Sequence, residues 1–249
     1  MIAQRLGSRA VPPTDRKPTF ERELAAVPDT RDREEWRTYL AYHERRYAVL
    51  SSVAHELLAG RPEPRILNIG PMFETTLLRA TGATVDTLGF PHPLFPPRAH
   101  ERHIDADLNE SASPGNGSYD LVVMAEVIEH LHAAPAGVLR GLAARLRPDG
   151  ALIVQTPNAV ALHKRLRMLA GRNPLEPIRA DPANPGHFHE YTLGELRDAA
   201  AEADLEVAGW RADNYFGAGP AARAYATLGR VLPPSLRHGI TIWARPRAG

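Results

Sequence analysis

The chain has 249 residues, of which 43% are hydrophobic and 24% charged, and its formal net charge is +1 at pH 7. These values are typical of a soluble globular protein with one sizeable core, and the small net charge does not favour a nucleic acid or an anionic membrane as partner. The sequence has no cysteine, which excludes disulfides, thiolate nucleophiles and cysteine-ligated zinc. We find no secretory signal and no apolar run near the ~20 residues that span a bilayer, so we expect a cytoplasmic protein.

Residues 1–60 are expected to form an N-terminal arm and a helical cap. Residues 1–30 show no sustained periodicity, whereas apolar residues recur at helical spacing over 32–58, before Gly60. This pattern predicts one or two amphipathic helices. From sequence, the helical segment could equally be a lid over an active site or a packing helix.

After Pro64, short apolar runs alternate with helical stretches. Strands are predicted at 65–69, 83–88, 103–106, 119–124, 151–155, 205–210 and 240–244. Helices are predicted at 73–81, from about 127, at 136–146 and at 192–203, with a turn at 147–150 and a long loop over 166–186. The alternation predicts an α/β fold with a doubly wound, mainly parallel, seven-stranded sheet over 61–249, with its core at 61–212 and a C-terminal segment at 213–249. Such sheets bind ligands at the carboxyl ends of their strands.

Three segments carry a family resemblance. The run YDLVVMAEVIEHL at 119–131, the run LRPDGALIVQTPN at 146–158 and the run HEYT at 189–192 occur in this order. Together they resemble class I S-adenosylmethionine-dependent methyltransferases, in particular the ubiquinone-biosynthesis O-methyltransferase type, over roughly 61–212. The resemblance implies a Rossmann-like fold and S-adenosylmethionine as cofactor.

The loop after the first strand departs from that family. There, an acid followed by Gly-x-Gly-x-Gly holds the methionine part of the cofactor. In this chain Asn68 replaces the acid and Gly70 is kept, but Met72 and Glu74 stand where glycines are usual. Pro71 offers no N–H. Asn68, Gly70 and Pro71 remain the cofactor-binding candidates, and the departure leaves open a methyltransferase-like binding protein without activity.

Other cofactor positions follow from the resemblance. An acid at the end of the second strand would bind the ribose, and Asp86 is the nearby acid, although it could equally be an ordinary surface carboxylate. After the third strand, Asp107 would accept a hydrogen bond from the adenine amino group and Leu108 would offer its backbone N–H. The alternative for Asp107 is a helix or turn cap. Ala125, at the end of the fourth strand, completes this set.

The most specific chemical pattern is Glu126-x-x-Glu129-His130. On a helix these positions share one face, so two carboxylates and an imidazole could converge on Mg²⁺ or Mn²⁺. The spacing is similar to that of metal-dependent 2′-O-methyltransferases acting on small-RNA ends, which implies His187 as a further ligand, with His189 as the alternative. Without a metal, His130 or His187 could act as general base. A purely structural role for all of them is the third alternative.

We therefore expect methyl transfer from S-adenosylmethionine to a hydroxyl of a small molecule, with a divalent cation as a candidate helper. An RNA 2′-O-methyltransferase is the alternative within the class, disfavoured by the near-neutral charge. A non-catalytic binding protein is the alternative from another class. A homodimer formed through the C-terminal segment is a further option.

Overall fold

The computed structural model describes residues 31–110, 117–180, 185–215, 217 and 232–247. The predicted arm at 1–30 therefore lies outside the described residues. The strands are β1 (Arg65–Ile69), β2 (Thr84–Gly89), β3 (His103–Asp105), β4 (Tyr119–Ala125), β5 (Leu146–Pro157), β6 (Leu205–Asp213) and β7 (Gly239–Pro246). The helices are α2 (Arg31–Leu58), α3 (Phe73–Arg79), α4 (Pro135–Ala143), α5 (Leu162–Leu169) and α6 (Leu193–Glu202), with short 3₁₀ turns η1 (Ile128–His130) and η2 (Pro234–Leu236).

The seven strands form one sheet in the order β3-β2-β1-β4-β5-β7-β6. Strands β1 to β5 pair in parallel, and β7 is antiparallel to both β5 and β6. The predicted doubly wound, mainly parallel, seven-stranded fold is confirmed. Strand order reverses between β1 and β4, which is where such a sheet opens a crevice for ligands.

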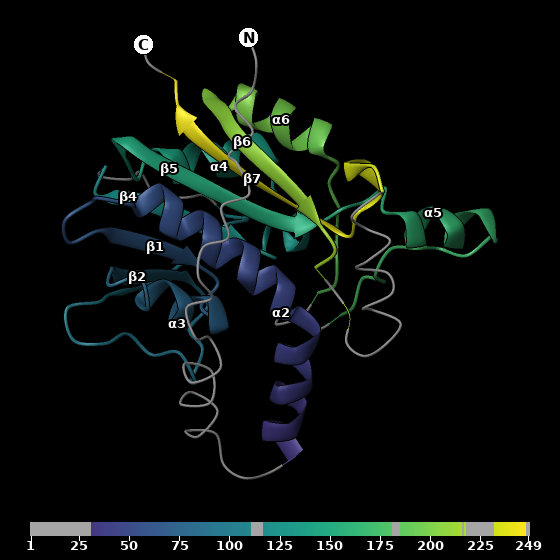
Figure 1. Ribbon diagram of the computed structural model, residues 1–249, viewed down its shortest axis with the longest axis horizontal. Coiled ribbons are helices and arrows are strands. Elements are labelled where there is room, and N and C mark those ends of the chain that lie inside the picture. Colours follow the sequence, from purple (N-terminus) through teal and green to yellow (C-terminus); the bar gives the residue numbers. More distant parts are fainter. Residues whose placement is uncertain (1–30, 111–116, 181–184, 216, 218–231, 248–249) are drawn as a thin grey trace.

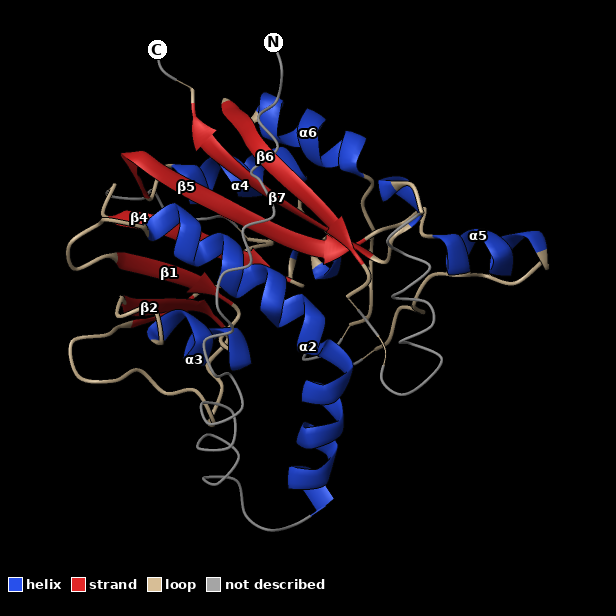
Figure 2. Cartoon of the chain, viewed as in Figure 1, coloured by secondary structure: helices blue, strands red, loops and turns tan. Residues whose placement is uncertain are grey.

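Helices cover both faces of the sheet (Figure 2). Successive residues of a strand point to opposite faces, and β1 shows this directly. Ile66 packs in the cluster that includes Leu50 and Val53 of α2, whereas Leu67 packs in the cluster that includes Leu139 of α4 and Leu196 of α6. The sheet thus has two separate apolar cores.

Helix α2 is one continuous helix of 28 residues (Figure 1). Its second half lies on the sheet, and its first half extends beyond the sheet edge. The predicted helical cap is therefore a single helix that is also a packing helix. None of the helices in the described ranges has the length and apolar character needed to cross a bilayer.

Four local predictions need correction. The predicted turn at 147–150 lies inside β5, where Tyr119 pairs with Leu146 but Leu121 pairs with Ala151, so the turn residues form a bulge. The helix predicted from about 127 is only the 3₁₀ turn η1, because the backbone becomes extended at Leu131, with φ −92° and ψ 140°. The helix predicted at 136–146 ends at Ala143, and α5 occupies the start of the predicted long loop.

Candidate active site

A cavity of about 540 Å³ opens at the carboxyl ends of β1, β2 and β4. It is lined by the turn after β1, the turn after β2, the residues after β4, and one side of α2: Gly70, Pro71, Met72, Glu74, Phe90, Pro91, His92, Ala125, Glu126, Val127, Tyr39 and Arg46. Gly70, Pro71 and Ala125 of the expected cofactor residues thus lie at one cavity, on the edge of the sheet where the fold predicts ligand binding.

The turn at Gly70 requires a glycine. Its φ is +73°, and a Cβ there would lie 3.1 Å from a methyl group of Val127. The Gly70 N–H donates to the Leu88 carbonyl at 2.8 Å, which fixes the turn against β2. Asn68, two residues earlier in β1, is fully buried. Its Nδ2 donates to the Thr75 hydroxyl at 2.9 Å, while its Oδ1 has no hydrogen-bond partner.

Arg46 is a candidate site residue that the sequence pattern does not reveal. A charged residue of an amphipathic helix is normally exposed, yet Arg46 is 1% exposed and lines the cavity. Its guanidinium lies 4.4 Å from the ring centre of Tyr47, and Nη2 donates to the Tyr39 hydroxyl at 3.4 Å. Its Nε and Nη1 have no hydrogen-bond partner. The cavity therefore contains a fixed positive charge.

Two carboxylates face the same cavity. Glu74 is 1% exposed, and burial raises its pKa to about 7 although the nearby Arg46 opposes the shift. Burial also raises the pKa of Glu126 well above its usual range, and the neighbouring charge of Glu129 adds to this effect. A positively charged ligand group in the cavity would lower both pKa values and favour the ionised carboxylates.

Asp86 does not lie where the resemblance places the ribose-binding acid. It stands in the middle of β2, fully buried, with Gly89 at the carboxyl end of the strand. Its carboxylate accepts hydrogen bonds from the side chains of Arg65, Arg102 and Tyr119 and from the Arg102 backbone N–H. These contacts occupy the carboxylate in a structural network, so the ribose role is withdrawn. Asp86 is not an ordinary surface carboxylate either.

Asp107 and Leu108 lie after β3, outside the residues that line the cavity. Oδ1 of Asp107 accepts from the Asn109 backbone N–H at 2.8 Å, and its carbonyl accepts from Glu110. These are the contacts of a turn cap, the alternative weighed for this residue. Leu108 is 6% exposed and belongs to the core beneath α4 and α6. Their adenine-binding roles remain predictions.

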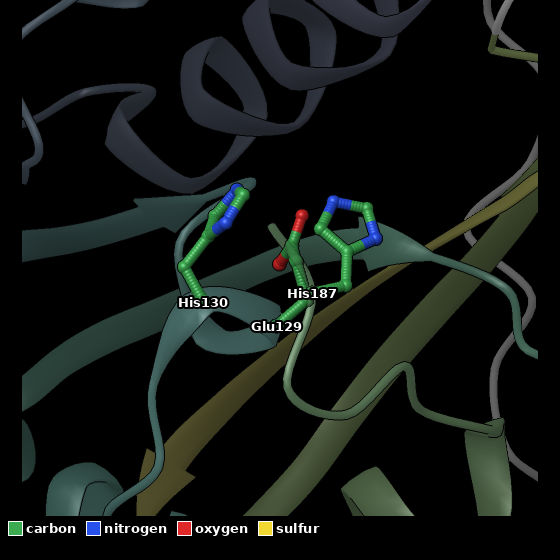
Figure 3. A group of neighbouring side chains, drawn as sticks. All are labelled: Glu129, His130 and His187. Carbon is green, nitrogen blue, oxygen red and sulfur yellow. The ribbon is translucent and has the colours of Figure 1, made fainter. Parts of the chain in front are cut away.

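Glu129, His130 and His187 come together after β4 (Figure 3). Each offers one ligand atom, and these atoms lie within 4.8 Å of one another. Figure 3 shows the Glu129 carboxylate and the two imidazole rings facing the same space, and the centres of the two rings are 4.8 Å apart in an edge-to-face contact. Among the described residues, this is the one group of three or more such side chains with metal-binding spacing.

Surrounding contacts fix the orientation of both imidazoles. His130 Nδ1 lies 2.7 Å from the Gly186 carbonyl, which can only accept, so this nitrogen carries the proton. His187 Nδ1 lies 2.9 Å from Glu190, whose carboxylate also pairs with the buried Lys164. His130 therefore presents Nε2 as a lone pair, which is the arrangement that a hydrogen bond at the other ring nitrogen gives to metal-binding histidines, whereas Nε2 of His187 faces Oε2 of Glu176 at 3.1 Å.

The Glu129 carboxylate is fully buried, and only one of its two oxygens has a hydrogen-bond partner. Its Oε2 accepts from the Thr156 hydroxyl at 2.9 Å, while Oε1 has no hydrogen-bond partner. Burial raises the pKa of Glu129 to about 7. Burial and the adjacent His130 lower the pKa of His187 to about 4, against the opposing charge of Glu176. A buried carboxylate beside two imidazoles is a donor set that suits a divalent cation.

Glu126 does not join this group. The sequence pattern predicts Glu126 on one helix face with Glu129 and His130, but Glu126 has a left-handed backbone that turns the chain before η1 begins. Its side chain lies at the cavity with Arg46 and Gly70. The role of Glu126 as a metal ligand therefore stays a prediction that the spacing of this group does not support. The structure instead brings Glu176 to the cluster, with Oε2 at 3.1 Å from His187 Nε2, and nothing in the sequence pattern indicated this residue.

The family of methyltransferase domains matches residues 42–208, which is more than half of the chain. The chain belongs to this family. Family and fold together make the protein an S-adenosylmethionine-dependent methyltransferase, as the resemblance implied. A sequence search of curated proteins finds no significant match.

Solved structures with the same fold are distant in sequence. A 1,6-didemethyltoxoflavin-N1-methyltransferase of Burkholderia thailandensis, with its acceptor and S-adenosylhomocysteine bound, is 19% identical with a TM-score of 0.52, covering 85% of this chain and 86% of that one. An S-adenosylmethionine-dependent methyltransferase of Mesorhizobium loti is 15% identical with a TM-score of 0.56, covering 78% and 96%. The CcbJ methyltransferase of Streptomyces caelestis is 17% identical with a TM-score of 0.55, covering 83% and 90%. These likenesses concern the fold.

Proposed function

We propose that this methyltransferase transfers the methyl group of S-adenosylmethionine to a hydroxyl oxygen of a small molecule, aided by a divalent cation at Glu129, His130 and His187. The observation that carries the proposal is the convergence of these three side chains beside the cavity at the ends of β1, β2 and β4. A hydroxyl is a poor nucleophile at neutral pH, so an oxygen acceptor needs a group that lowers its pKa or takes its proton.

The donor set supports a cation. Glu129 has one buried oxygen without a partner, and His130 keeps Nε2 free because its Nδ1–H is bonded elsewhere. His187 adds a second imidazole, whose Nε2 lies 3.1 Å from Oε2 of Glu176. Bound there, Mg²⁺ or Mn²⁺ would act as a Lewis acid on the acceptor hydroxyl. In the transfer the S–CH₃ bond breaks as the O–CH₃ bond forms, S-adenosylhomocysteine is the leaving group, and the proton of the hydroxyl passes to solvent water.

A small acceptor fits the charge and the comparisons. The net charge of +1 gives little attraction for a polyanion, and the Burkholderia thailandensis structure holds a small molecule beside S-adenosylhomocysteine. That enzyme methylates nitrogen by its name, so the nature of the acceptor atom must be tested here.

The test uses mass spectrometry with S-adenosylmethionine that carries a deuterated methyl group. Purified protein is incubated with a panel of phenols, sugars and hydroxylated amino acids, and with matched amines, with EDTA or with added Mn²⁺. We expect deuteromethyl ethers, loss of the product in EDTA, and recovery with Mn²⁺. The Glu129→Ala variant should not recover, whereas Glu202→Ala, at an exposed position of α6, should. Methylation of the amines alone would overturn the oxygen acceptor, and full activity in EDTA would overturn the cation.

A further inference from the structure

Three side chains that line the cavity, and Asn68 in the strand that leads to it, carry buried polar atoms with no hydrogen-bond partner. They are Nε and Nη1 of Arg46, Oδ1 of Asn68, Oε2 of Glu74 and Oε1 of Glu126. A buried polar group without a partner destabilises the folded protein, because it has lost its hydrogen bonds to water without replacement. The gathering of these atoms at one cavity indicates that a polar ligand completes them.

The charges around the cavity have both signs and are held apart. Arg46 comes from the middle of α2, Glu74 from the first turn of α3, and Glu126 from the residue after β4. Arg46 and Glu74 are each 1% exposed, and each affects the pKa of the other through space. The Arg46 guanidinium donates a hydrogen bond to the Tyr39 hydroxyl and not to either carboxylate. Separate buried charges of opposite sign match a ligand that itself carries both.

Asn68 stands at the position where the family has an acidic residue, and Glu74 follows it six residues later in the chain. Asn68 near the end of β1 is neutral, and its amide lies close enough to the Glu74 carboxylate to lower the pKa of Glu74, which favours the ionised form. The negative charge that is missing from β1 is thus supplied from α3, a few residues later in the chain. Glu74, which stands where a glycine is usual, replaces a function of the strand rather than blocking the cavity.

We propose that the cavity binds the amino-acid end of S-adenosylmethionine, with the α-carboxylate at Arg46 and the α-ammonium at Glu74. This inference rests on the proposed function, because that cofactor carries the zwitterion. Nε and Nη1 of Arg46 are free N–H donors for a carboxylate, and Oε2 of Glu74 is a free acceptor for an ammonium group. Glu126 adds a second negative charge near the ammonium and the sulfonium.

The test compares two ligands that differ only in the amino-acid part. S-adenosylhomocysteine carries the zwitterion, whereas 5′-methylthioadenosine keeps the adenosyl thioether and lacks it. By isothermal titration calorimetry we expect S-adenosylhomocysteine to bind at least about tenfold more tightly. Glu74→Gln should weaken it by about 10–100-fold, the range of a charge-assisted hydrogen bond, and should leave 5′-methylthioadenosine within about twofold. Arg46→Met should have the same selective effect.

The outcomes separate the two proposals. If neither ligand binds the wild-type protein, the S-adenosylmethionine-binding function fails. If both ligands bind the wild type with equal affinity, or if Glu74→Gln weakens both alike, the zwitterion assignment fails while the cofactor assignment stands. Binding of 5′-methylthioadenosine also shows that each variant is folded. Glu202→Gln, at an exposed site on α6, is the matched control for loss of one carboxylate and should change neither affinity.

Discussion

Replacing Asp86 by Asn should lower stability strongly and leave cofactor affinity almost unchanged. Oδ2 of Asp86 accepts from Arg65 Nη2 at 2.9 Å, Arg102 Nη2 at 3.1 Å and the Tyr119 hydroxyl at 2.8 Å, and Oδ1 accepts from the Arg102 backbone N–H at 2.8 Å. An asparagine amide group must replace one of these oxygens with a donor. In the better orientation the amide faces the Arg102 N–H and one buried hydrogen bond is lost.

The magnitude follows from these contacts. The orphaned backbone donor costs about 1–3 kcal/mol, and the three remaining hydrogen bonds lose their charge assistance. That second contribution is discounted, since the Arg102 and Arg65 side chains are 60% and 34% exposed and water screens them. We expect a total loss of about 3 kcal/mol in the free energy of unfolding, which for a chain of this size lowers Tm by roughly 6–12 °C.

The assay has two readouts. Urea unfolding gives the stability change, and calorimetric titration with S-adenosylhomocysteine well below Tm gives the affinity of the folded protein. Asp198→Asn, at an exposed position of α6, is the control and should change neither. A variant of Asp86 with normal stability and an affinity reduced tenfold or more would refute the structural role and restore the ribose role predicted from the sequence.

Three further results are expected. Gly209→Ala would place a methyl group 2.2 Å from the Trp243 ring across the β6–β7 pair, so overpacking should cost about 1–3 kcal/mol in urea unfolding, and an unchanged midpoint would contradict this packing. Affinity for S-adenosylhomocysteine should fall about tenfold from pH 8 to pH 6, because the Glu74 pKa is about 7 and its ionised form binds the ammonium; a flat profile would count against that contact. Thr192→Ala removes the hydroxyl that accepts from the Glu195 N–H at the start of α6 and should cost about 1 kcal/mol without affecting ligand binding, whereas a matching loss of affinity would mean that this helix shapes the site.

The strands were predictable because each is a local apolar run. Residues 119–124 and 151–155 are buried along their length, and their neighbours in the sheet follow from the parallel rule. The capping box of Thr192 was also predictable, since both partners lie within one helical turn, and it is confirmed. Patterns confined to a few consecutive residues are those that the sequence displays.

The site was harder to predict because it depends on distant contacts. The burial of Arg46 requires α2 to lie over the ends of β1 and β4, and the network of Asp86 joins side chains from β1, β4 and the segment before β3. The separation of Glu126 from Glu129 depends on one left-handed residue, which ordinary propensities do not predict for glutamate. The pairing of His187 with His130 was anticipated by resemblance, and the contact of Glu176 was not.

Helix α2 ties the cavity wall to the centre of the molecule. Its Arg46 and Tyr39 face the cavity, while Leu50 and Val53, on the next turns, belong to a core cluster beneath the sheet. A segment anchored in this way cannot swing aside as a hinged flap without exposing that core. Shortening the protein to begin at residue 61 would therefore remove a wall of the ligand site and uncover apolar surface at the same time. Loss of solubility and loss of cofactor affinity should then appear together in any such truncation.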